Sequence, residues 1–157
     1  MKELYLSNGK LVQVDNSDYI ELSKFNWFQA KGPNTQYAFR NKKKPCGKWS
    51  TELMHRAIMK LKDGEFVDHI DGNGLNNCRN NLRSATKSQN GANSRPCGVS
   101  KYLGVCWSKS SQRWAVSISK DNKRTYLGGF IKETDAALAY NAIAIKKHGE
   151  FARLNIL

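Results

Sequence analysis

Apolar and polar residues alternate in short runs through the first fifty residues, a pattern that predicts strands rather than long helices. The dipeptide Asn8-Gly9 lies between two such runs and predicts a tight hairpin turn. Asp18 and Glu21 have the spacing of a helix start, so we expect a short helix to follow. Runs at residues 37–40 and 49–54 predict strands joined by a lysine-rich loop, which either contacts phosphates or is a solvated turn.

The last third of the chain carries longer alternating runs followed by one helical run. Three strands are predicted, at residues 102–107, 113–119 and 124–130. A helix is predicted at residues 134–147, with Thr134 as its N-cap and Gly149 just beyond its end. The middle strand has an apolar face from Trp114 to Ile118, which we expect to pack against the helix, and a small polar face that we expect to be exposed.

The charge of the chain points to a polyanionic partner. The 157 residues include 26 Lys and Arg against 13 Asp and Glu, a net charge of +13, which favours binding to nucleic acid or to an anionic membrane surface. Both halves are basic. The chain shows no long apolar run and no apolar signal-peptide core at its N-terminus, so we expect a soluble protein of the cytoplasm, with no membrane or protein partner.

The four cysteines do not suggest a metal site. Cys46, Cys78, Cys97 and Cys106 form no C-x-x-C pair and have no histidine at zinc-ligand spacing. We therefore expect free thiols rather than a zinc site or a disulfide framework.

A cluster of polar residues in the middle of the chain suggests chemistry. Residues 65–70 predict a strand that ends in Asp68-His69 and runs into a glycine-rich loop. Further on, Thr86 and Gln89 have the capping-box spacing, which would fix Asn90 in the first turn of a helix. Carboxylate and carboxamide oxygens suit a hard cation such as Mg²⁺, and an imidazole beside them can activate water. These groups can together hydrolyse a phosphodiester.

This part of the chain resembles the HNH endonucleases of phages and mobile introns. The residues that carry the resemblance are Met54-His55-Arg56, Val67-Asp68-His69-Ile70-Asp71-Gly72-Asn73, Asn76-Asn77, Asn81-Leu82-Arg83 and Thr86-Lys87-Ser88-Gln89-Asn90. The resemblance covers about forty residues in the family's order. It implies a ββα-metal fold, in which a β-hairpin and a helix hold one metal ion.

The resemblance also implies a role for each residue of the motif. His69 would be the general base, and Asp68 and Asn90 would hold one Mg²⁺ or Mn²⁺ ion. Asn81 would tie the hairpin loop together and orient His69. An asparagine at the last position resembles the homing branch of the family, which implies a nuclease with a preferred site. Arg56, Arg79 and Arg83 are candidate phosphate contacts or solvated surface residues, and for His55 we expect packing or a hydrogen bond near the site.

Residues 101–155 resemble the AP2 DNA-binding domain, which lays a three-stranded sheet in the major groove. The motifs that carry this resemblance are Tyr102-Leu103-Gly104-Val105, Arg113-Trp114, Tyr126-Leu127-Gly128-Gly129-Phe130, Ala136-Ala137-Leu138-Ala139-Tyr140-Asn141 and Ala152-Arg153-Leu154-Asn155. The implied DNA contacts are Lys109, Arg113, Lys120, Lys123, Arg124 and Tyr126. Outer positions that often carry arginine in that family are Leu103, Cys106 and Ser117 here, so we expect modest base readout.

The predicted fold is α+β, with a ββα-metal nuclease module followed by a three-stranded antiparallel sheet packed on one helix. We expect an N-terminal α+β segment at 1–52 that belongs to the nuclease domain, the HNH motif at 53–93, a linker at 94–100 and the AP2-like domain at 101–157. The predicted function is metal-dependent cleavage of double-stranded DNA. The alternatives are a non-catalytic DNA-binding regulator and, with less support from the motifs, an RNA-binding protein.

Overall fold

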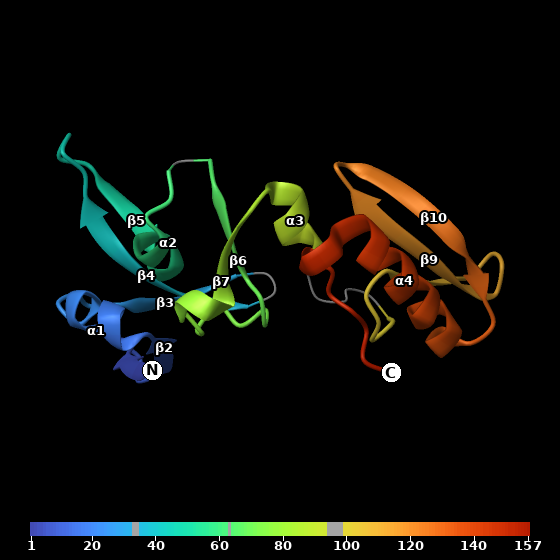
Figure 1. The fold of residues 1–157 in the computed structure, drawn as a ribbon, viewed down its shortest axis with the longest axis horizontal. Coiled ribbons are helices and arrows are strands. Elements are labelled where there is room, and N and C mark those ends of the chain that lie inside the picture. Colours follow the sequence, from blue (N-terminus) through green and yellow to red (C-terminus); the bar gives the residue numbers. More distant parts are fainter. Residues whose placement is uncertain (33–34, 63, 94–98) are drawn as a thin grey trace. The chain divides into compact units, whose positions relative to one another are not determined.

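The computed structural model describes residues 1–32, 35–62, 64–93 and 99–157. The chain folds into two compact units, Met1–Ala85 and Thr86–Leu157, which are described separately (Figure 1). The linker expected at 94–100 falls mainly on residues 94–98, outside the described residues. Within the described part of the chain, no helix is long and apolar enough to cross a membrane.

In the described residues of the first unit, three small antiparallel sheets combine with two short helices. Its elements are β1 (Lys2–Tyr5), β2 (Leu11–Val14), α1 (Asn16–Leu22), β3 (Phe28–Lys31), β4 (Gln36–Lys43), β5 (Trp49–Leu53), α2 (Met54–Met59), β6 (Phe66–His69), the 3₁₀ turn η1 (Arg79–Asn81) and β7 (Leu82–Ala85). The sheets are β1–β2, β3–β4–β5 and β6–β7. The predicted Asn8-Gly9 hairpin is confirmed, and Gly9 has the positive φ (80°) that its turn requires.

A single hydrophobic core joins the N-terminal elements to the hairpin that carries the Asp-His pair. Val12 and Val14 from β2 are fully buried with Met54 from α2, and Val67 and Leu82 from β6 and β7 belong to the same cluster. The N-terminal segment therefore forms part of the core on which the candidate site rests.

Helix α1 begins earlier than the sequence predicts. Its N-cap is Asp15, and Asp18 lies in the first turn instead of before it. The Asp15 side chain makes no capping bond because its Oδ2 accepts a hydrogen bond from the backbone N–H of Arg79 at 2.7 Å. A tertiary contact has thus replaced the local cap that the spacing of Asp18 and Glu21 suggested.

The second unit is a three-stranded antiparallel sheet covered by one helix, as predicted. Its elements are α3 (Lys87–Ala92), β8 (Val105–Ser108), β9 (Arg113–Lys120), β10 (Lys123–Phe130), α4 (Glu133–His148) and the 3₁₀ turn η2 (Gly149–Phe151). The strand order is β10–β9–β8, and α4 lies along one face of the sheet (Figure 1). Val116 and Ile118 of β9 pack against Ala136, Ala137 and Tyr140 of α4.

Two boundaries in this unit differ from the prediction. The first strand begins at Val105 rather than at residue 102, because Gly104 takes a positive φ of 74° and bends the chain under the ring of Tyr140. Helix α4 begins at Glu133 with Lys132 as N-cap, so Thr134 is not the cap. Gly149 ends the helix as predicted. Leu103, expected on the outer face, packs instead against the core of this unit.

Candidate active site

Hairpin β6–β7 sets the positions of the Asp-His pair. Asp68 lies opposite Arg83, and His69 lies opposite Leu82. The strand ends at His69, and the chain then turns because the Gly72 N–H donates to the His69 carbonyl at 2.8 Å and the Ile70 N–H to the Asn81 carbonyl at 2.9 Å. Gly72 has a φ of 70°, which favours glycine at this turn. The bend lets neighbouring residues of one strand approach a common site.

Asp68 is a buried carboxylate with a charged partner. It is only 3% exposed, and its Oδ2 accepts hydrogen bonds from both Nε and Nη2 of Arg83, at 2.8 and 2.7 Å. A buried carboxylate without compensation would be strongly unfavourable, and the ion pair with Arg83 supplies that compensation.

His69 is buried as an uncharged base. Its side chain is 6% exposed, and Nε2 lies 3.4 Å from Oδ1 of the fully buried Asn77. Burial lowers the pKa of His69, and the hydrogen bond with Asn77 and the charges of Asp71 and Asp68 only partly oppose this effect. A neutral imidazole at neutral pH can accept a proton from water, which a protonated one cannot.

Two aromatic residues from distant parts of the chain surround His69. The ring of His55, from α2, meets the His69 ring edge-on with centroids 5.0 Å apart, and the Tyr37 ring of β4 lies 6.0 Å from His69. His55 is buried, its Nδ1 has no hydrogen-bond partner among the described residues, and burial lowers its pKa to about 3. Burial, and then the charge of Asp68, raise the pKa of Tyr37. The sequence motif gave no indication of Tyr37, which lies in another sheet.

Asn81 ties together the loop that follows His69. Its Oδ1 accepts from the Asp71 N–H at 3.0 Å, and its Nδ2 donates to Asp71 Oδ1 and to the Asn76 carbonyl, both at 2.9 Å. Burial alone would raise the pKa of Asp71, but hydrogen bonds from Asn73, Asn76 and Asn81 outweigh it and lower the pKa. These bonds connect Asn81 to both Asp71 and Asn76 and so brace the loop that follows His69.

The same loop is anchored to the N-terminal part of the unit. The Gln13 N–H of β2 donates to the Leu75 carbonyl at 2.9 Å, and the Asn77 N–H donates to the Gln13 carbonyl at 2.8 Å. Gly74 rests on β4, where a Cβ would collide with the Gln36 carbonyl and the Tyr37 ring. The loop is therefore clamped on two sides by elements that come much earlier in the chain.

The three arginines predicted near this site all bind protein groups. Arg79 forms a two-point ion pair with Asp18 of α1, at 2.8 and 2.7 Å, and Arg83 holds Asp68. Arg56 donates from Nη2 to the Lys62 carbonyl at 2.7 Å and from Nη1 to the Glu65 carbonyl. Arg79 thus links α1 to the end of the loop formed by residues 70–78, which we call the catalytic loop. The sequence did not indicate this contact.

Asn90 lies on α3, in the second unit, and the local structure predicted for it is confirmed. The Gln89 N–H donates to Thr86 Oγ1 at 3.2 Å, and Oε1 of Gln89 accepts from the Thr86 N–H at 2.7 Å, which completes the capping box. Asn90 is therefore in the first turn of a capped helix, as the spacing predicted. Among the residues that the structure describes, no cluster of three His, Cys, Asp or Glu side chains could hold a metal.

Of the six residues predicted to contact DNA in the second unit, three share one face of the sheet and three do not. Arg124 and Tyr126 of β10 lie opposite Ser119 and Ser117, on the face away from α4, and Arg113 shares that face. The other three lie elsewhere: Lys120 donates to the Lys147 carbonyl of α4 at 2.7 Å, Lys123 pairs with Lys120 at the β9–β10 turn, and Lys109 follows β8. Tyr126 is 66% exposed, and Arg124 Nε donates to Ser117 Oγ at 2.9 Å.

The β6–β7 hairpin of this strongly basic chain thus carries a buried carboxylate and an imidazole, side chains that can take part in activating water. The family described as HNH endonuclease matches residues 53–92. The uncharacterized HNH endonuclease L560 of Acanthamoeba polyphaga mimivirus is 32% identical over 154 residues, which cover 94% of this chain and 75% of that protein. Protein 3.8 of Escherichia phage T7 is 32% identical over 95 residues, which cover 59% of this chain and 78% of that protein.

The chain belongs to the HNH endonuclease family and is a DNA-cleaving enzyme. The alternative of a non-catalytic regulator is therefore set aside.

Proposed function

We propose that the protein hydrolyses phosphodiester bonds of double-stranded DNA with one bound divalent ion, Mg²⁺ or Mn²⁺, and with His69 as the general base. The observation that supports this most directly is the buried imidazole of His69, which follows the Asp68 carboxylate at the end of β6 and whose pKa is lowered by that burial. An imidazole with a lowered pKa remains unprotonated through the pH range in which most cells operate.

Asp68 and Asn90 are the proposed ligands of the ion, and their donor atoms fit it. Mg²⁺ prefers oxygen ligands and usually keeps several waters, so one carboxylate and one carboxamide leave room for water and for a phosphate oxygen. Arg83 binds the Asp68 carboxylate at Oδ2, and Asn90 is held in the first turn of α3 by the Thr86–Gln89 capping box. When bound, the ion supplies positive charge to the scissile phosphate and to the leaving 3′ oxygen.

In the proposed reaction, His69 takes a proton from the attacking water, and the new P–O bond forms as the bond to the 3′ oxygen breaks. The imidazolium that results is favoured by the carboxylates of Asp68 and Asp71, both of which raise the pKa of His69. Asn77 lies at Nε2, and Asn81 keeps Asp71 in place, so both act as positioning residues. The chain's own contribution is thus a base that is neutral before the step and stabilised after it.

Plasmid cleavage tests this mechanism. Supercoiled DNA is incubated with the protein and Mg²⁺, with chelator, and with His69→Ala; nicking is expected only for the native protein with the ion. His148→Ala is the matched control. It also removes a histidine, but His148 lies at the end of α4, so its replacement should leave activity unchanged. Cleavage by His69→Ala at the native rate would refute the assignment of the base.

We further propose that the second unit is an AP2-like module that directs the enzyme to preferred, homing-like sites. The support is the exposed sheet face with Arg113, Arg124 and Tyr126, together with the resemblance of residues 101–155. Few arginines line this face, so it should act mainly through phosphates and groove shape. Arg124→Ala with Tyr126→Ala should weaken duplex binding about tenfold, while Lys146→Ala on α4 should not. Equal binding by both variants would exclude the targeting role.

A further inference from the structure

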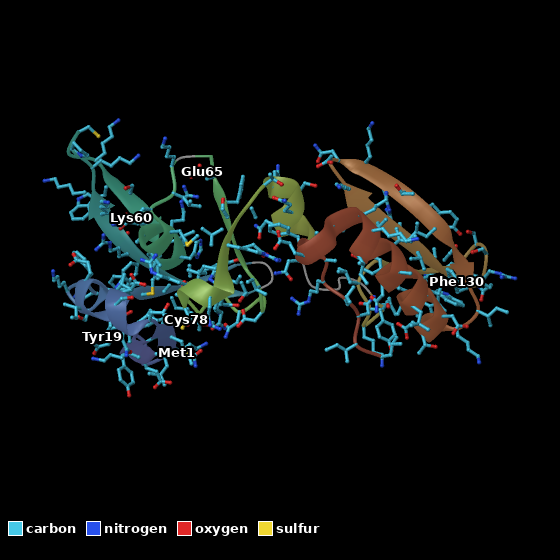
Figure 2. The ribbon with its side chains drawn as sticks, viewed as in Figure 1. Met1, Tyr19, Lys60, Glu65, Cys78 and Phe130 are labelled. Atoms are coloured by element: carbon cyan, nitrogen blue, oxygen red, sulfur yellow. The ribbon has the colours of Figure 1, made fainter. Side chains whose placement is uncertain are left out.

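The β4–β5 hairpin of the first unit extends beyond the core of that unit. Its far end, residues 41–49, is exposed at every position, and we refer to it as the arm. Figure 1 shows the arm projecting from the edge of the unit, and Figure 2 shows long side chains with nitrogen ends spreading around it. Hydrophobic packing does not explain why this sequence continues as a regular hairpin so far from the core.

The arm is held in a defined shape. Strand pairing runs from Phe39↔Leu53 to Lys43↔Trp49, and the turn closes with the Lys44 N–H donating to the Lys48 carbonyl at 2.7 Å. At its base, the guanidinium of Arg40 bonds Glu52 at 2.6 Å and stacks on the Phe25 ring at 3.6 Å. The arm therefore presents its side chains from a braced support and not from a loose loop.

The charge of the hairpin is strongly positive. Residues 36–53 contain five basic side chains and one acidic residue, Glu52, for a net charge of +4. Glu52 is already engaged by Arg40 and Lys42 at the base. None of the ion pairs formed by the described residues involves Lys43, Lys44 or Lys48. Three lysines at one tip repel each other in isolation and are favoured beside a polyanion.

An exposed tryptophan lies among these lysines. Trp49 is 69% exposed, and it lies directly across from Lys43, on the opposite face of the hairpin from Arg40, Lys42 and Glu52. A large aromatic side chain left in water costs free energy that a partner can recover. An aromatic ring among lysines suits nucleic acid, where the cations reach phosphates and the ring packs on a sugar or a base.

Strand β4 links the arm to the active site. Tyr37, near its start, lies against His55 and His69, and Lys43 is its last residue. Six strand residues span about 20 Å at about 3.3 Å each. Base pairs of duplex DNA are spaced about 3.4 Å apart, so on a duplex running along β4 the arm would lie about six base pairs from the bond that His69 would attack.

We propose that the arm is a second DNA-contact surface of the nuclease, in which Lys43, Lys44 and Lys48 bind phosphates about six base pairs to one side of the cleaved bond and Trp49 packs on the sugar or base there. This proposal rests on the proposed function of the first unit. It assigns a DNA contact to residues outside both the HNH motif and the AP2-like region.

The test is binding of the full chain to a fluorescent 40-base-pair duplex, measured by anisotropy against salt in chelator. Replacing the three arm lysines by alanine should reduce the slope of log affinity against log salt by about 2.7, because about 0.9 ion is released for each phosphate contact. Lys2, Lys24 and Lys62, all exposed lysines of the same unit, form the matched triple-alanine control. A slope change in the control as large as in the arm variant would overturn the proposal.

Trp49 gives an independent measurement. Trp49→Ala should weaken binding about tenfold, while Trp49→Phe should retain most of the affinity. The side chain is mostly exposed, so neither variant should shift the thermal unfolding midpoint, and circular dichroism checks this. A duplex that ends within about three base pairs of the cleaved bond, on the arm side, should remove the difference between native and variant proteins. Unchanged affinity for Trp49→Ala on the long duplex would contradict the contact.

These experiments distinguish a failure of the proposed DNA contact by the arm from a failure of the proposed catalytic mechanism. If the arm variants lose affinity but cleave at the native rate on saturating DNA, both proposals stand. If the native protein binds through the arm but never cleaves, the arm is right and the catalytic assignment fails. If the arm variants bind DNA normally but lose binding to vesicles of phosphatidylserine and phosphatidylcholine, the partner is an anionic lipid and the DNA proposal is wrong.

Discussion

Replacing His55 by glutamine is expected to make the first unit less sensitive to acid. Burial lowers the pKa of His55 from its ordinary 6.5 to about 3, so the native state holds this imidazole neutral while the unfolded chain takes up a proton below pH 6.5. Above pH 6.5 the neutral His55 imidazole therefore costs the native state no stability relative to the unfolded chain. As the pH falls from 6.5 toward 3, protonation of the unfolded chain progressively lowers the free energy of unfolding. At pH 4.5, two pH units below 6.5, the loss amounts to about 3 kcal/mol.

The assay follows denaturant unfolding of the native protein and of His55→Gln between pH 7.5 and 4.5, in chelator. The native protein should lose about 3 kcal/mol more than the variant across this range, whatever their stabilities at pH 7.5. Titration by nuclear magnetic resonance reads the same quantity directly from the imidazole. The control is His148→Gln, whose histidine also has a pKa lowered by burial but lies in the second unit. Parallel acid profiles for native protein and His55→Gln, or an imidazole that titrates near pH 6.5, would refute the reasoning.

Three further substitutions test the support of the active site. Asn81→Ala removes three hydrogen bonds of the loop and should cost about 3 kcal/mol in denaturant unfolding and abolish plasmid nicking; an active, stable variant would show that the loop holds without it. Thr86→Ala should destabilise α3 by about 1 kcal/mol and slow nicking, with recovery in Thr86→Ser, and no change in rate would mean that the cap does not position Asn90. Gly74→Ala forces a Cβ against the Tyr37 ring and should cost about 2 kcal/mol, whereas Gly64→Ala, with open space around it, should show only the smaller cost of its positive φ.

The local features of the site could be predicted from the sequence because short spacings determine them. The Asp68-His69 strand end, the capping box at Thr86 and the Gly149 helix end all depend on residues within a few positions of one another. Alternation on β9 likewise gave the buried face correctly, with Val116 and Ile118 in the core. In each case local backbone chemistry and burial favour the same structure.

The features that the sequence missed depend on contacts between distant segments. His55 and Tyr37 meet His69 from a helix and a strand that lie 14 and 32 residues upstream, and no motif spacing encodes those approaches. The α1 boundary was wrong because Asp15 bonds the backbone of Arg79, 64 residues later. Side chains that satisfy distant partners cannot be told from local caps by composition or spacing.

The clamp of Gln13 on Leu75 and Asn77 also bears on how the enzyme acquires activity during synthesis. Contacts that close over some sixty residues are costly in loop entropy, so they form late and slow the folding of the unit. The β1–β2 hairpin is synthesised before the catalytic loop, so its bonds to that loop cannot form until the loop has followed. The chain therefore remains without a formed catalytic loop until most of the first unit has been synthesised, which delays cutting of DNA by incomplete chains.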